Sequence, residues 1–192
     1  MGARIGVGLL GLGAVGGGVA EILLNPEDRH PLVAELDLIR VAVRDLNRPR
    51  SVELPDAVLT ADPNGVVNNP DVDVVVEVIG GIEPARSLIL QAIANGKSVV
   101  TANKAVIARH GPEIASAAKA AGVYVLIEAA VGGGIPIIEP LKQSLGGNRI
   151  NRVSGIINGT TNYILTRMAD EGAAYADVLA EAQRLGYAEA DP

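Results

Sequence analysis

The glycine-rich segment at residues 11–16 restricts the fold of this 192-residue chain more than any other stretch. A short apolar run, Ile5–Leu10, precedes it and has the length and composition of a buried β-strand. Apolar residues with helical spacing follow over Ala14–Leu24, and Asn25-Pro26 ends the pattern. A buried strand that turns through glycines directly into a helix predicts the first half of a βαβ unit.

This segment has the pattern GxGxxG, which is typical of a dinucleotide-binding turn when it joins a strand to a helix. Gly11 permits the tight turn, Gly13 lets a pyrophosphate approach the backbone, and Gly16 lets the helix pack on the strand. The free N–H groups at the helix N-terminus attract phosphate. The alternative is a plain glycine-rich turn without a ligand. We predict cofactor contacts along the whole motif, at Gly11, Leu12, Gly13, Ala14, Val15 and Gly16.

Strands and helices alternate over roughly the first 130 residues, which predicts βαβ units. The expected strands are almost entirely apolar, as in a parallel sheet that is buried on both faces. We therefore expect an α/β fold, a Rossmann-type doubly wound parallel sheet. Further strands are expected at 36–43, 73–79, 98–101 and 123–127, and further helices at 84–94 and 112–121.

The pattern changes after Glu128, where three consecutive glycines suggest a hinge or a tight turn. We place a domain boundary near residue 130, so that residues 1–130 form the nucleotide-binding domain and 131–192 an incomplete α+β domain. In the second region we expect helices at 135–145, 160–169 and 176–185 and a strand at 151–158.

Composition excludes several kinds of function. The chain has no Cys, so disulfides, thiolate zinc sites and thiol nucleophiles are excluded. A net charge of −6 and only four aromatic residues, all Tyr, argue against nucleic-acid binding. We find no signal-peptide pattern and no apolar run long enough to span a bilayer, and therefore expect a cytoplasmic protein without membrane association.

The end of the second expected strand bears on cofactor choice. An acidic residue there binds the 2′-hydroxyl of NAD, whereas Arg accommodates the 2′-phosphate of NADP. Arg44 follows the strand, with Arg48 and Arg50 close behind, which favours NADP. Asp45 keeps NAD possible. The alternative is a solvated basic loop.

Ligands of this fold lie outside the carboxyl ends of the strands. Gly80 follows the third expected strand and Lys104 the fourth, so both are predicted to face the nicotinamide half of the cofactor. The alternatives are a simple turn at Gly80-Gly81 and a surface lysine that opens a helix capped by Asn103.

Two further segments carry candidate sites. Glu128 beside irregular backbone is a possible hard-cation ligand, or else a capping carboxylate. The turn around Thr160 could hold a carboxylate, or Thr160 or Asn158 could simply cap the next helix. His30 and His110 have no partner pattern, and we interpret both as surface or loop residues.

Taken together, five segments in the same order resemble homoserine dehydrogenase along essentially the whole chain. They are Val41-Ala42-Val43-Arg44-Asp45, Thr101-Ala102-Asn103-Lys104, Glu128-Ala129-Ala130-Val131-Gly132-Gly133-Gly134-Ile135-Pro136, Asn158-Gly159-Thr160-Thr161-Asn162-Tyr163 and Gly186-Tyr187-Ala188-Glu189-Ala190-Asp191-Pro192.

The resemblance implies reversible oxidation of L-homoserine to L-aspartate 4-semialdehyde in threonine, methionine and isoleucine biosynthesis. It implies a homodimer that uses NAD(P); with Arg44 at the end of the second strand, we expect NADP(H) to be preferred and NAD(H) to remain possible. By this resemblance Lys104 lies at cofactor and substrate and assists catalysis, and Gly186 contacts the cofactor. The remaining implied roles are substrate binding by Glu189, Gly159 and Thr160, and a sodium site at Glu128, Val131, Gly133 and Ile135.

The departure from the family lies at the end of the chain. The family signature that begins near Ala182 continues to an Asp that holds substrate and a Lys that shuttles the proton, and this chain stops at Pro192 before both. We therefore expect cofactor binding with little or no turnover. A non-catalytic nucleotide-sensing module is the alternative. Thiol-dependent aldehyde dehydrogenases are excluded by the missing Cys, and Asn103-Lys104-Ala105 differs from the Glu-Lys-Pro of sugar oxidoreductases.

Overall fold

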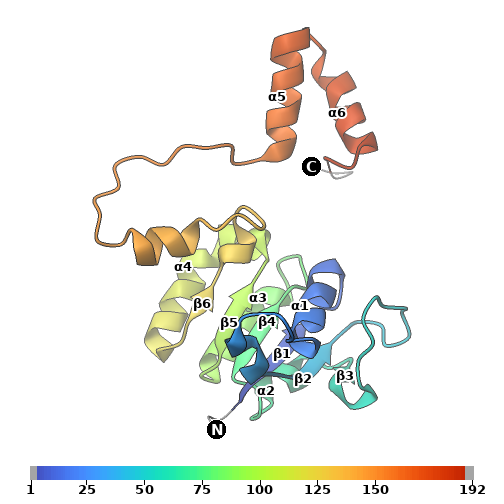
Figure 1. Ribbon diagram of the computed structural model, residues 1–192, viewed down its shortest axis with the longest axis vertical. Helices are drawn as coiled ribbons and strands as arrows, with labels where there is room; N and C mark the ends of the chain where they lie inside the picture. The colour runs from blue at the N-terminus through green and yellow to red at the C-terminus, as the bar shows by residue number, and fades with distance from the viewer. Residues whose placement is uncertain (1–3, 189–192) are drawn as a thin grey trace. The chain divides into compact units, whose positions relative to one another are not determined.

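The computed structural model describes residues 4–188, which form two compact units that divide between Leu145 and Gly146. The first unit is an α/β domain and the second is a pair of helices (Figure 1). The domain boundary expected near residue 130 stays a prediction.

The first unit is built on one parallel sheet with the strand order β3-β2-β1-β4-β5-β6. This order belongs to doubly wound dinucleotide-binding folds, so the predicted fold class is confirmed. Its strands are β1 (Ile5–Leu10), β2 (Leu36–Ala42), β3 (Leu59–Thr60), β4 (Val74–Glu77), β5 (Ser98–Thr101) and β6 (Val125–Leu126).

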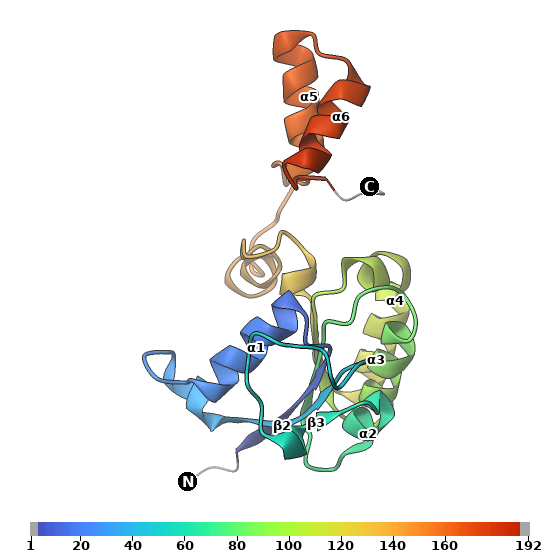
Figure 2. The same cartoon turned by 90° about the vertical axis from the view of Figure 1, so that its right-hand side faces the viewer.

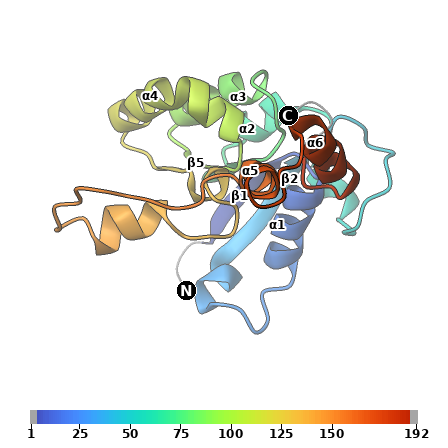
Figure 3. The same ribbon diagram turned by 90° about the horizontal axis from the view of Figure 1, so that it is seen from above.

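Helices cover both faces of the sheet. Helix α1 lies on one face, and α2, α3 and α4 lie on the other (Figures 2 and 3). The α-helices of this unit are α1 (Ala14–Leu24), α2 (Pro63–Asn68), α3 (Ala85–Ala94) and α4 (Lys104–Ala121). Shorter helical turns are η1 (Pro31–Glu35), η2 (Asp56–Val58), η3 (Glu128–Ala130) and η4 (Pro140–Ser144).

Each face of the sheet has its own apolar core, which explains the continuous apolar strands. Along β1, Leu9 packs in the core with Ala20 of α1, whereas Leu10 packs in the opposite core with Val66 of α2. Gly8 makes room for this second core, because a Cβ there would lie 2.7 Å from Cγ1 of Val66.

Two of the expected helices differ from the structure in their bounds. Helix α4 begins at Lys104 rather than residue 112, which confirms the alternative of a lysine that opens a helix capped by Asn103: the Asn103 side chain accepts from the N–H of Val106 at 3.2 Å. Pro112 lies inside this helix. Only a short π-helical turn, η4, occupies the segment expected to be a helix at 135–145.

The second unit contains α5 (Gly159–Glu171) and α6 (Tyr175–Arg184), which pack around a small apolar core of Ile164, Val178 and Ala182. Arg167 of α5 ties the two helices together through an ion pair with Glu181 of α6 at 3.0 Å.

The strand expected at 151–158 was wrong. This segment is irregular, and Ile157 is 97% exposed. A strand needs a neighbour to satisfy its backbone hydrogen bonds, and every paired strand within residues 4–188 belongs to the first unit. None of the helices in the described part of the chain is long and apolar enough to cross a membrane.

Candidate nucleotide-binding site

The β1–α1 turn has the three glycine environments that the motif requires. Gly11 adopts a φ of +101°, and a Cβ there would lie 2.8 Å from the carbonyl oxygen of Val78. A Cβ at Gly16 would collide with the backbone of Gly11, 2.9 Å from its carbonyl carbon. A Cβ at Gly13 would meet nothing within 4 Å. The first and third glycines are therefore required by packing, whereas Gly13 borders open space that a ligand can fill.

Helix α1 presents its N-terminus to this open space. Gly13 is the N-cap residue, and no side chain forms a capping hydrogen bond there. Because the first-turn N–H groups of a helix have no partners within the helix, a phosphate oxygen can accept them.

A cleft of about 620 Å³ begins at this turn and runs across the carboxyl ends of β1, β2 and β4. Its volume is in the range of small-molecule and cofactor sites. The cleft is lined by Gly11, Leu12, Gly13, Ala42, Val43, Arg44, Asp45, Arg48, Arg50, Ala61, Pro63, Val78, Ile79, Gly80, Glu83 and Pro84.

The three arginines of the loop after β2 differ in their hydrogen bonds and exposure. Arg50 holds the loop in shape, since its Nη1 donates to the carbonyl oxygens of Leu46 at 3.0 Å and Arg48 at 2.8 Å. The Asp45 carboxylate is turned into the same loop and accepts from the N–H of Asn47 at 2.9 Å. Arg44 and Arg48 line the cleft with exposed side chains.

A buried polar group that the sequence did not reveal lies directly before Val78, Ile79 and Gly80 of the cleft lining. Glu77, the last residue of β4, is 0% exposed and is hydrogen-bonded to Thr101 and Asn103. Its only signal in the sequence is a single carboxylate within the otherwise apolar run at residues 74–79.

The cleft brings together some of the predicted cofactor residues, namely Gly11, Leu12, Gly13, Arg44 and Gly80. Ala14, Val15 and Gly16 continue the same turn into α1 without lining the cleft. Lys104 opens α4 at the same edge of the sheet, has an exposed side chain and is not part of the cleft lining.

The other predicted contacts lie in the second unit. Thr160, in the first turn of α5, donates its hydroxyl to the carbonyl oxygen of Tyr187, so this turn and Gly186 are close together. Asn158 caps α5 by accepting from the N–H of Thr161 at 2.7 Å, as one of the sequence alternatives expected. Glu189 lies outside the described residues.

Glu128 acts as a capping carboxylate. Its Oε1 accepts from the N–H groups of Ile137 at 2.6 Å and Ile138 at 2.9 Å, and its Oε2 accepts from Glu139 at 2.6 Å. These backbone hydrogen bonds, that of Ile137 foremost, lower the pKa of Glu128 below its ordinary value. The residues described contain no cluster of three His, Cys, Asp or Glu side chains that could hold a metal.

The lowered pKa of Glu128 predicts a pH-dependent contribution to stability. The charged carboxylate stabilises the fold above the ordinary glutamate pKa of 4.5, and this contribution is lost as the pH falls through the lower pKa of the folded state. Glu128→Gln should therefore lower the melting temperature most at neutral pH. In thermal unfolding, the difference from the unsubstituted chain should shrink at acid pH, and a constant difference would contradict this assignment.

Neither histidine joins the cleft. His30 is exposed and caps η1 through Nδ1, which accepts from the N–H of Leu32 at 3.3 Å. His110 lies on α4 with Nδ1 3.4 Å from Glu113.

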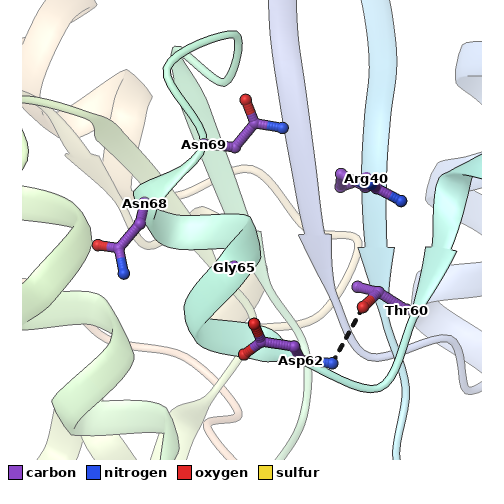
Figure 4. A pocket seen from close by; sticks show the side chains of 6 residues that line it. All are labelled: Arg40, Thr60, Asp62, Gly65, Asn68 and Asn69. Atoms are coloured by element: carbon purple, nitrogen blue, oxygen red, sulfur yellow. Dashed lines mark hydrogen bonds between the residues drawn. The ribbon is translucent and has the colours of Figure 1, made fainter.

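A second, smaller pocket of about 250 Å³ lies beside α2 (Figure 4). Several of its polar residues already have hydrogen-bond partners: the N–H of Asp62 donates to Thr60 Oγ1 at 3.1 Å, and Arg40 of β2 donates to the carbonyl oxygen of Ala57 at 2.6 Å. Helix α2 also lacks a side-chain cap, but its N-cap residue is the acidic Asp62, which disfavours a phosphate, and the pocket contains no glycine-rich strand–helix turn. The larger cleft is therefore the better candidate for a nucleotide.

Strand order, glycine turn and cleft define a dinucleotide-binding α/β protein. Residues 11–128 match the family model described as the homoserine dehydrogenase NAD-binding domain, and residues 136–192 match the model described as homoserine dehydrogenase. The chain therefore belongs to the homoserine dehydrogenase family.

Individual relatives agree with this assignment. A homoserine dehydrogenase of Synechocystis sp. is 64% identical over 97% of this chain. The crystal structure of a homoserine dehydrogenase from Thiobacillus denitrificans superposes with a TM-score of 0.82 at 53% identity and covers 98% of this chain and 44% of its own. The structure of a hyperthermophilic archaeal homoserine dehydrogenase in complex with NADPH superposes with a TM-score of 0.81 at 30% identity. The match covers 98% of this chain and 63% of the archaeal chain.

The chain spans 43% of the length of its curated relative from Synechocystis sp. and 43% of that from Corynebacterium glutamicum, which is 50% identical.

Proposed function

We propose that this chain forms the cofactor-binding part of a homoserine dehydrogenase that prefers NADP(H) and can use NAD(H). The observation that carries the proposal is the cleft in which the open Gly13 turn and the uncapped N-terminus of α1 lie on the same surface as Arg44. The turn suits a pyrophosphate, and the guanidinium suits a 2′-phosphate. The archaeal relative was solved in complex with NADPH, which is consistent with a preference for NADP(H).

The proposed reaction is reversible oxidation of L-homoserine to L-aspartate 4-semialdehyde, a step of threonine, methionine and isoleucine biosynthesis. The nicotinamide supplies the hydride chemistry when it is bound. Gly80 and Gly186 are proposed to contact the cofactor, and Lys104 is proposed to assist at the substrate. Glu189 and the Gly159-Thr160 turn are proposed to orient the amino acid, which contributes by proximity.

We further propose that the 192-residue chain alone binds cofactor with little or no turnover, since it spans less than half the length of its curated relatives. Spectrophotometric detection of NADPH formation from homoserine by the purified chain would contradict this. A non-catalytic nucleotide-binding module is the second candidate for this chain, and it is favoured by the same cleft; cofactor binding without turnover would be its mark.

Arg44→Ala is expected to weaken NADP⁺ binding by roughly tenfold, since a charge-assisted hydrogen bond is worth about 1.5 kcal/mol or more, and to leave NAD⁺ binding nearly unchanged. Calorimetric titration with each cofactor at fixed salt measures both values. Arg40→Ala is the matched control, because it removes the same charge from strand β2 at a residue outside the cleft. An equal loss in both variants would show a general charge effect and contradict the assigned role of Arg44.

A sodium ion at Glu128, Val131, Gly133 and Ile135 is proposed as well. Oε2 of Glu128 accepts one backbone N–H group, which leaves this oxygen acceptor capacity for a cation. A homodimer of the intact enzyme and a cytoplasmic location remain predictions.

A further inference from the structure

Glu77 occupies a central place under the proposed cofactor cleft. It is the last residue of β4, opposite Leu10 of β1 and Thr101 of β5 in the sheet register. The residues that follow these three strand ends are the glycine motif, the Gly80-Gly81 turn and the start of α4. Its side chain is 0% exposed, so the carboxylate depends on protein groups for hydrogen bonds.

The carboxylate connects these segments through its two oxygens. Oε1 accepts from the N–H of Ile79 at 2.9 Å, and Nδ2 of Asn103 approaches it at 3.4 Å. Oε2 accepts from the hydroxyl of Thr101 at 2.7 Å. Asn103 then donates to the carbonyl oxygen of Gly81 at 2.7 Å and caps α4 at Val106.

This network links the turn after β4 to the helix that begins with Lys104. The same Asn103 side chain contacts Glu77, the Gly81 carbonyl and the α4 N-terminus, so a displacement of Glu77 changes both segments. Val75 and Val99, two residues before Glu77 and Thr101 in their strands, belong to a buried apolar core. A buried carboxylate is costly to retain there without a full set of hydrogen bonds.

We infer that Glu77 is a positioning residue that places the Gly80-Gly81 turn and the Asn103-Lys104 segment against the nicotinamide half of the cofactor. The inference rests on the proposed function. It assigns Glu77 no contact with the cofactor, and it predicts a selective effect: loss of the carboxylate disturbs the nicotinamide side of the cleft and leaves the Arg44 side intact.

The test compares two ligands. NADP⁺ spans the cleft, whereas adenosine 2′,5′-bisphosphate reports only on the adenosine end. In Glu77→Leu the Kd for NADP⁺ should rise by roughly tenfold, the equivalent of losing one hydrogen bond to a charged group, while the Kd for adenosine 2′,5′-bisphosphate should stay unchanged. Glu77→Gln, which keeps the shape and one acceptor oxygen, should retain most of the NADP⁺ affinity.

Lys97→Met is the matched control for buried charge. Lys97 is 6% exposed, precedes β5 at the opposite end of the sheet, and donates from Nζ to the carbonyl oxygens of Asn69 at 2.7 Å and Val72 at 2.5 Å. This variant should lower the melting temperature and leave both Kd values unchanged.

The outcomes separate the inference from the proposed function. If the Glu77→Leu chain does not fold, Thr101→Val must show the same selective loss, because the Thr101 hydroxyl belongs to the same network: it donates to Oε2 of Glu77 and accepts from the N–H of Asn103 at 3.0 Å. Equal weakening of both ligands, or no weakening of either, would overturn the role of Glu77. Failure of the unsubstituted chain to bind NADP⁺ would overturn the proposed function, and this inference with it.

Discussion

Gly13→Val is expected to weaken dinucleotide binding by roughly a hundredfold, the equivalent of two charge-assisted hydrogen bonds of about 1.5 kcal/mol each. The new side chain fills the open space beside the N-terminus of α1, where phosphate oxygens are proposed to accept backbone N–H groups. The fold should be largely unaffected, because a Cβ there meets nothing within 4 Å and the backbone is extended, with φ −81° and ψ −158°, so that no left-handed conformation is required. Calorimetric titration with NADP⁺ and thermal unfolding measure the two effects.

Gly18→Ala is the matched control for this prediction. Gly18 lies in the same helix, and a Cβ there also meets nothing within 4 Å. Because alanine favours the helix, this variant should be more stable by about 0.5–1 kcal/mol and bind NADP⁺ as the unsubstituted chain does. A Gly13→Val chain that is folded and binds normally would place the phosphates elsewhere.

Gly16→Ala is expected to act on folding instead. Its Cβ would collide with the carbonyl group of Gly11, which is backbone and cannot rotate away. Overpacking of this kind costs about 3 kcal/mol, which corresponds to a fall in melting temperature of roughly 6–12 °C for a chain of this size. Thermal unfolding followed by circular dichroism, with Gly18→Ala as the reference, measures the shift. A fall in melting temperature of less than about 1 °C would contradict the close helix–strand packing at this turn.

The sequence predicted the elements whose signals are local. The bounds of β1, α1 and β5 match the expected ranges, because an apolar run, a glycine turn and the Asn25-Pro26 terminator all act within a few residues. The parallel sheet followed from apolar strands that alternate with helices, and the observed strand order confirms it.

The remaining features depend on tertiary contacts. The start of α4 is set by the Asn103 cap, which is in turn held by Glu77 from another strand and by the Gly81 carbonyl. Glu77 itself is separated from Thr101 by 24 positions, so no local pattern marks their hydrogen bond. The apolar spacing at 151–158 suggested a strand, but hydrophobic alternation alone supplies no partner for its backbone.

The candidate site likewise contains features that the sequence predicts and features that depend on the folded structure. The glycine motif and Arg44 were predicted from sequence and share one cleft. The division of labour among the arginines could not be predicted, because it depends on the loop conformation that Arg50 stabilises.

A dinucleotide is proposed to bind across the carboxyl ends of β1, β2 and β4. An amide-resolved NMR titration of the 192-residue chain with NADP⁺ tests it most directly. Saturable shifts are expected at Gly11, Gly13, Arg44 and Gly80, with none at Arg40 and Asn68, which line only the pocket beside α2. Saturable shifts confined to Arg40, Asp62 and Asn68 of that pocket, or no saturable shifts at all, would contradict it.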